Sequence, residues 1–160
     1  MYKLLLFFLM SVVLFMMYAL QTDEELAMFT LFQGKRGLNH AVHAAAQQSD
    51  AAKLARGIHS IDEAAARSVA LEYLQQNLQL DSNMTPLPGT FLRSQVELVD
   101  WTVINENETF PFTYMNTAYG YTVTLQRPGV VAIVRLSFPR TYNVLGPITW
   151  TIKSSAEMVY

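Results

Sequence analysis

The three histidines come closest, by type and spacing, to a site for chemistry. His40 and His43 lie three apart in a helix-forming segment, a spacing that can bind a metal ion from one helix face, and His59 follows nearby. No carboxylate stands at a matching position, since Asp50 is about two turns away. We therefore expect solvated or interface histidines, with no metal site and no cofactor.

His59, Ser60 and Asp62 supply the residue types of a hydrolytic triad. Adjacent positions at the start of a helix do not give triad geometry, and Ser60 with Glu63 instead predicts a capping box, with Ser60 as the N-cap. The chain has no Cys, which excludes a thiolate metal site and a Cys nucleophile. It also has no phosphate-binding glycine loop, HExxH motif or GxSxG motif. The sequence therefore predicts no enzymatic activity.

Aromatic residues gather in the second half of the chain, where they have two interpretations. They can line a binding surface on a sheet, or they can pack in the sheet's own core. The residues concerned are Tyr114, Tyr119, Tyr121, Tyr142 and Trp150.

Composition limits the class of protein. Apolar residues make up 51% of the 160 residues and charged residues 15%, which is richer in apolar residues than a typical soluble domain. The formal charge is −2, and Lys and Arg are scattered, so no nucleic-acid partner is expected. The length suits one compact domain plus an anchor.

An uninterrupted apolar run, residues 4–20, accounts for much of the apolar excess. It amounts to about 25 Å of helix, at the short end for a membrane span. The alternative is a cleaved signal peptide, but no small-x-small cleavage site follows the run. We expect an uncleaved membrane anchor over residues 1–25, with the N-terminus in the cytoplasm. Its principal residues are Leu4, Leu5, Leu6, Phe7, Phe8, Leu9, Val12, Val13, Leu14 and Phe15.

Helix-forming residues continue without a stop beyond the anchor, which predicts a stalk helix over residues 26–57 that ends at Gly57. One face carries mainly small residues at alternating spacings of four and three, and Gly34 and Gly37 are expected to mark a bend. Small side chains let another helix approach closely, either in an assembly or within the protein's own head. This packing stripe includes Gly34, Leu38, Ala41, Ala45, Ala52 and Ala55.

Residues 58–160 are predicted to form an α+β head outside the cytoplasm. A second helix is expected over residues 61–80, and apolar alternation then predicts a small, mostly antiparallel sheet of about four strands. Those strands are residues 95–104, 121–125, 130–138 and 148–158, and residues 105–117 are expected to be irregular.

This layout resembles the TadE/TadG-like pilin-related proteins of bacterial tight-adherence (Flp-type) pilus systems. The resemblance is carried by the apolar span, the Ala-rich stretch at residues 38–46 and the capped second helix with Ala64-Ala65-Ala66. It implies a single-pass membrane protein that acts in a pilus or secretion apparatus through assembly and without catalysis. Other pilin-like subunits, or further copies of the same chain, would be its partners.

A second function remains open. A membrane-tethered sensor or ligand-binding domain, using the aromatic-rich sheet face, would have the same anchor and head. The packing stripe favours the first function, and the aromatic residues favour the second.

Overall fold

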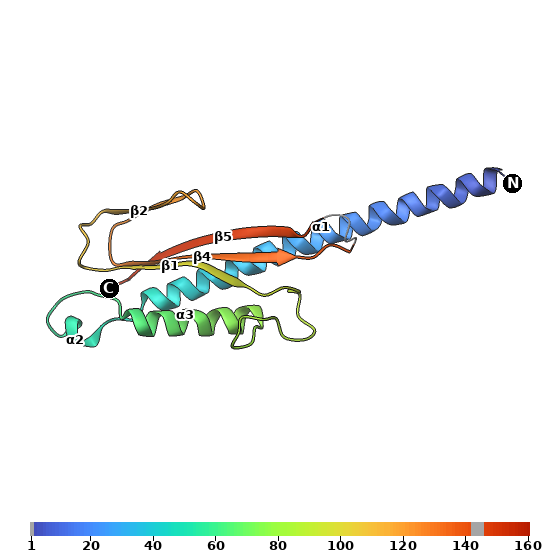
Figure 1. Cartoon of the computed structure of the whole chain (residues 1–160). Coiled ribbons are helices and arrows are strands. Elements are labelled where there is room, and N and C mark those ends of the chain that lie inside the picture. Colours follow the sequence, from blue (N-terminus) through green and yellow to red (C-terminus); the bar gives the residue numbers. More distant parts are fainter. Residues whose placement is uncertain (1, 142–145) are drawn as a thin grey trace.

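A single helix, α1 (Tyr2–Ala46), forms the long axis of the molecule, and every other element gathers around its second half (Figure 1). This computed structural model describes residues 2–141 and 146–160. It confirms the α+β class. The other elements are α2 (Ala51–Leu54), α3 (Glu63–Leu78), β1 (Glu97–Ile104), β2 (Phe112–Asn116), β3 (Tyr121–Leu125), β4 (Gly129–Phe138) and β5 (Ile148–Glu157).

The predicted stalk helix is too long, because α1 ends at Ala46 rather than near Gly57. Beyond Ala46 the chain pairs with the segment ahead of α3. Ser49 forms an isolated β-bridge with Ile61, and the Asp62 amide donates a hydrogen bond of 2.8 Å to the Gln48 carbonyl. These tertiary hydrogen bonds replace the helical ones. Gly57 is a helix stop, as predicted, but it ends the short α2, with a left-handed φ of +76°.

The N-cap of α3 also differs from the prediction. Asp62, rather than Ser60, is the cap, and its carboxylate accepts a hydrogen bond from the Ala65 amide. Ser60 is buried in the bridged segment, where its hydroxyl accepts a hydrogen bond of 3.1 Å from the Lys53 ammonium.

The strands form two antiparallel sheets. One has the order β1-β4-β5, and the other is the hairpin β2-β3. About four strands were predicted, and the five observed include β2, which lies in the segment expected to be irregular. The alternation of Phe112 and Tyr114 with Thr113 and Met115 is a strand signal there, and the structure shows the corresponding alternation of half-buried and exposed side chains.

A β-bulge at Val99 keeps the apolar side chains of β1 on one face. Leu98 pairs with Val134 and Asp100 with Ile133, so Val99 has no partner and the alternation shifts by one. Leu98 and Trp101, three apart, therefore both pack on the main core. Without the bulge one of them would face the other side of the sheet.

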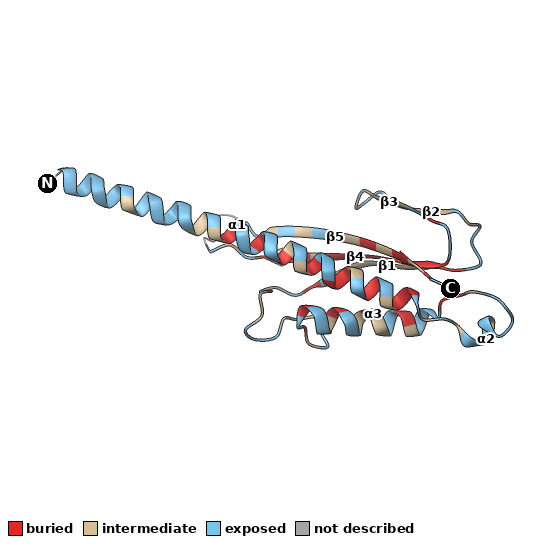
Figure 2. Cartoon of the chain, turned by 180° about the vertical axis from the view of Figure 1, so that it is seen from behind, coloured by how far each residue is buried: buried red, intermediate tan, exposed pale blue. Residues whose placement is uncertain are grey.

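The main core lies between the three-stranded sheet and the helices. α1 contacts β4, β5 and α3, and the hairpin covers part of the opposite face of the sheet (Figure 1). The buried residues of α1 all lie from Asp23 onward, in the half that packs on the sheet and α3 (Figure 2). That half belongs to the head's core and is not a separate stalk.

Candidate functional site

The apolar run at the start of α1 projects beyond the rest of the molecule (Figures 1 and 2). The most apolar stretch of 18 residues in α1 contains no buried residue. The large apolar side chains from Leu4 to Tyr18, which include every predicted anchor residue, are 42–77% exposed. Soluble monomers rarely expose so large a contiguous apolar surface. Within the described residues, α1 is the one helix that is long and apolar enough to cross a membrane.

Two glycines let the second half of α1 lie very close to its neighbours. A Cβ at Gly34 would stand 2.2 Å from Leu136 Cδ1 and 2.7 Å from Ile152 Cδ1, on β4 and β5. A Cβ at Gly37 would stand 2.9 Å from a methyl carbon of Leu78 on α3. α1 continues through both glycines without interruption. Their role is therefore close packing, and the helix break that a bend would suggest is not seen.

The predicted packing stripe divides into a buried part and an exposed part. Gly34, Leu38, Ala41 and Ala45 are buried in α1 against the protein's own sheet and α3. Ala52 and Ala55 are exposed and lie beyond the end of α1. The small side chains of the buried part thus serve packing inside one molecule, which was the second of the two alternatives.

Acidic residues at the junction of the two halves hold the segment that follows β4. Asp23 is 3% exposed, and its carboxylate accepts hydrogen bonds from the Thr141 amide at 2.8 Å and the Thr141 hydroxyl at 2.7 Å. Glu24 forms an ion pair of 3.0 Å with Arg140. Two charge-assisted hydrogen bonds offset the burial of the Asp23 carboxylate, so the junction is fixed to the head.

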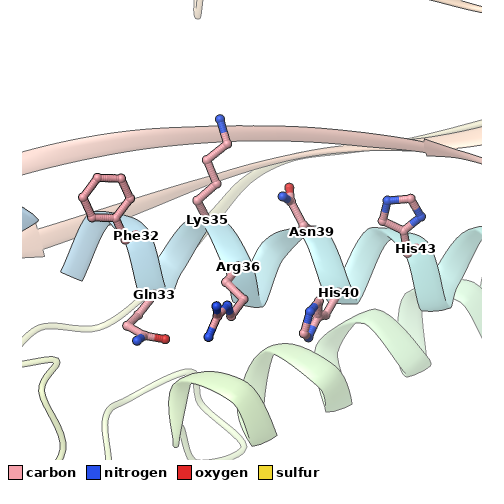
Figure 3. Close-up of a pocket in the computed structure, with 7 residues that line it drawn as sticks. All are labelled: Phe32, Gln33, Lys35, Arg36, Asn39, His40 and His43. Carbon is pink, nitrogen blue, oxygen red and sulfur yellow. The ribbon is translucent and has the colours of Figure 1, made fainter. Parts of the chain in front are cut away.

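The side of α1 turned away from the sheet remains uncovered, and we call it the open face. It bears a groove of about 570 Å³ lined by α1 side chains alone. In Figure 3 they project to both sides of the helix axis, and Lys35, Arg36, His40 and His43 among them are exposed. The groove contains no acidic side chain. Its lining residues are Phe32, Gln33, Lys35, Arg36, Asn39, His40 and His43.

The histidines do not converge on one site. His40 and His43 lie on the open face, whereas the His59 ring stacks on Tyr160 with a centroid distance of 3.8 Å. Among residues 2–141 and 146–160, no group of three or more His, Cys, Asp or Glu side chains could hold a metal ion.

The aromatic residues do not form one surface. Tyr114 and Tyr121 attach the hairpin to the back of the sheet: the Tyr114 hydroxyl donates to Asp100, and the Tyr121 hydroxyl donates to Ser155 at 3.1 Å. Burial and the neighbouring Asp100 carboxylate raise the pKa of Tyr114. Trp150 packs on the opposite face, in the main core. Tyr142 lies outside the described residues.

A clasp at the far end of the head joins α2 to the loop after β1. The Lys53 ammonium lies 2.6 Å from a Glu106 carboxylate oxygen. Hydrogen bonds from Lys53 and then Ser60 lower the pKa of Glu106 from 4.5 to about 2. The neighbouring Asn105 side chain is buried and bonds both the amide and the carbonyl of Ile61, at 2.8 and 3.0 Å. None of these contacts was evident from the sequence, because the partners lie more than forty positions apart.

The structure therefore combines three features: an exposed apolar first half of α1, a closely packed head, and an exposed basic face on the second half of α1. No protein-family model, no curated protein and no solved structure matches this chain.

Proposed function

We propose that this protein is a membrane-anchored, pilin-like structural or accessory subunit of a bacterial pilus or secretion apparatus, and that it acts by helix packing and assembly. The observation that carries the proposal is the division of one continuous helix into a bare apolar half and a half that forms the core of the head. A TadE-like subunit would use the two halves in this way, one for the bilayer and one as the spine of the head.

The contacts at the junction support this role. Asp23 and Glu24 follow the apolar run and are held by Thr141 and Arg140, so the head begins at the point where the apolar run ends. A rigid connection of this kind suits a subunit whose head must keep a fixed position relative to its anchor. A tethered sensor needs no such connection, and its supposed aromatic surface is divided between two faces of the sheet.

Cell fractionation tests the anchor. The full chain should sediment with membranes, resist alkaline carbonate and be released by detergent, because burying the side chains of residues 4–20 stabilises the inserted state. Intact-mass measurement should find the apolar run still on the mature chain. Recovery in the soluble fraction, or a mass lacking about the first 20 residues, would contradict the anchor.

Protease protection tests the orientation. With the N-terminus in the cytoplasm, added protease should degrade the head only after the outer barrier of the cell is opened, while a tag placed before residue 4 stays protected. Protection of the head under those conditions would reverse the proposed topology. Deletion of the gene should then abolish pili or secretion, and unchanged pili and secretion would contradict the assembly role.

A further inference from the structure

Two arginines from distant parts of the chain lie near the junction between the apolar run and the head. Arg140 follows β4, which ends on the side of the head nearest the apolar run (Figure 1). Its guanidinium forms the 3.0 Å ion pair with Glu24. The Arg93 guanidinium lies 5.9 Å from the ring centre of Phe138, the last residue of β4, and within electrostatic reach of Asp23. Both positive charges are therefore held beside α1, at the start of the head.

The chain on either side of Arg93 is packed in place. Leu92 is buried in the main core, and the Phe91 ring packs edge-on against Phe29 of α1, with 5.4 Å between the ring centroids. Arg93 itself is exposed. Its charged side chain is therefore presented to the surroundings by a segment that is fixed to the core and to α1.

Both guanidinium groups have N–H donors to spare. Among the described residues, Arg93 takes part in none of the ion pairs, and Arg140 uses one of its five N–H groups in its own ion pair. The nearby Asp23 carboxylate already accepts two hydrogen bonds. The exposed Glu25 projects about 200° away from Asp23 around the helix. An anion from outside the molecule can therefore bind to the two arginines.

The junction lies in the headgroup layer when residues 4–20 span the bilayer. Its two acidic residues stand ~4.5–6 Å along the helix beyond Leu20, and a headgroup layer is ~5–7 Å thick. The basic groove on the open face lies much further out, since Arg36 is ~24 Å beyond Leu20. The anion at the level of the junction is therefore the phosphate of a phospholipid.

We infer that Arg93 and Arg140 together bind the phosphate group of a phospholipid in the leaflet beneath the head. Guanidinium groups bind phosphate through charge-assisted hydrogen bonds, and they are more weakly hydrated than the ammonium group of Lys. The inference rests on the proposed function, because it needs the anchor to be in a bilayer. It deepens that function by adding a second contact between the head and the membrane.

The position of the two arginines beside α1, rather than on it, gives the contact its role. A single helix fixes where the head leaves the membrane, whereas its tilt and rotation depend on neighbouring contacts and on anchoring side chains at the interface. A phosphate bound to Arg93 and Arg140 lies off the helix axis. The head therefore keeps one orientation relative to the bilayer surface, which the single helix alone does not impose.

Solid-state NMR measures this contact directly. The full chain, with ¹³C at the guanidinium carbon of all seven arginines, is reconstituted in phosphatidylcholine vesicles. Recoupling to ³¹P attenuates the signal of a guanidinium carbon that lies about 4 Å from a phosphorus atom, the separation set by hydrogen bonds of ~2.8 Å. We expect about two-sevenths of the arginine signal to be attenuated, because two of the seven arginines contact phosphate.

Conservative variants assign the attenuated signal. Arg93→Lys together with Arg140→Lys keeps both charges and should remove the attenuation. Arg67→Lys, at an exposed position of α3, is the matched control and should leave the attenuated intensity unchanged. Attenuation that persists in the double variant, or an inserted wild type without attenuation, would overturn the inference and leave the anchor standing. A chain that does not enter the vesicles would contradict the anchor as well.

Melting temperatures in two media provide the second test. In phosphatidylcholine nanodiscs, Arg93→Gln should lower the melting temperature of the head by about 1–4 °C, because a ligand that binds the folded state stabilises it. In a maltoside detergent, which has no phosphate, the same variant should melt like the wild type. Arg67→Gln is the control and should melt like the wild type in both media. An equal loss in both media would mean that Arg93 stabilises the head by itself, and either that result or no loss in nanodiscs would contradict the lipid contact.

Discussion

The first half of α1 presents large Leu, Phe and Met side chains to its surroundings, whereas the second half buries Gly and Ala against the sheet and α3. The backbone conformation is the same in both halves. What differs is the distance to the next surface. The bare half needs bulky side chains to fill a lipid or partner environment, and the packed half needs small ones because β4, β5 and α3 lie so close. Side-chain size along one helix thus records what surrounds it.

The largest expected effect on stability comes from placing a charge in the main core of the head. Val134 on β4 is fully buried in the main core, so Val134→Asp leaves an unpaired charge that costs several kcal/mol. That is a large part of the ~5–15 kcal/mol that stabilises a typical domain, and the head should unfold. Thr151→Asp, at an exposed position of β5, is the control and should melt like the wild type. Unchanged melting of Val134→Asp, measured by circular dichroism in detergent, would show that this face is not the core.

A charge in the first half of α1 should have the opposite effect: it should weaken membrane insertion and leave the melting temperature of the head unchanged. Val12 lies at the centre of the apolar run, and Val12→Arg should cost about 2.5–3.5 kcal/mol of insertion free energy. The head should melt unchanged, because Val12 is exposed and the apolar stretch around it has no buried residue. The measurements are membrane fractionation and thermal melting, with Val12→Leu as the control. A destabilised head would show that the two halves are not independent, and unchanged membrane association would show that Val12 is not at the centre of a bilayer.

The alanines of the predicted stripe allow a direct comparison of buried and exposed positions. Ala41→Leu with Ala45→Leu should lower the free energy of unfolding by about 1–3 kcal/mol per site through overpacking, since both are fully buried. Ala52→Leu with Ala55→Leu makes the same change at exposed positions and should stay within about 0.5 kcal/mol. Denaturant titration of the full chain in detergent measures both. If the first pair were neutral while oligomers were lost, the buried alanines would instead serve contacts between subunits.

The helices and strands that depend on local sequence pattern could be predicted from the sequence alone. The apolar run, the second helix and the strands at Tyr121–Leu125, Gly129–Phe138 and Ile148–Glu157 were each predicted to within a few residues. Hydrophobic periodicity and turn residues specify these segments without reference to the rest of the chain.

The errors arose where tertiary contacts override local preference. Helix-forming residues continue beyond Ala46, but the backbone there pairs with the segment at Ile61. Ser60 is a good N-cap residue, yet it is buried beneath Lys53 and Asp62 takes the role. A small-residue stripe does not reveal whether its partner is another molecule or another part of the same chain.

The last prediction concerns the clasp between Lys53 and Glu106, at the end of the head furthest from the apolar run. Lys53 and Ser60 lower the pKa of Glu106 to about 2, so the carboxylate is more acidic in the folded protein than in the unfolded chain. This contribution to stability is fully present above the ordinary pKa of 4.5 and is lost as the pH falls toward 2. The effect should be small, since both side chains of the ion pair are 33% exposed.

Glu106→Gln should therefore melt slightly below the wild type at neutral pH, and the difference should shrink as the pH approaches 2, where the wild-type carboxyl is also becoming neutral. Glu108→Gln, on the same loop and exposed, is the control and should show no such convergence. A difference between Glu106→Gln and the wild type that stays constant with pH would mean that Glu106 acts through packing rather than charge. The clasp would then be stabilised by close packing, as the second half of α1 is. It would differ from the junction at Asp23 and Glu24, where charged side chains make the contacts.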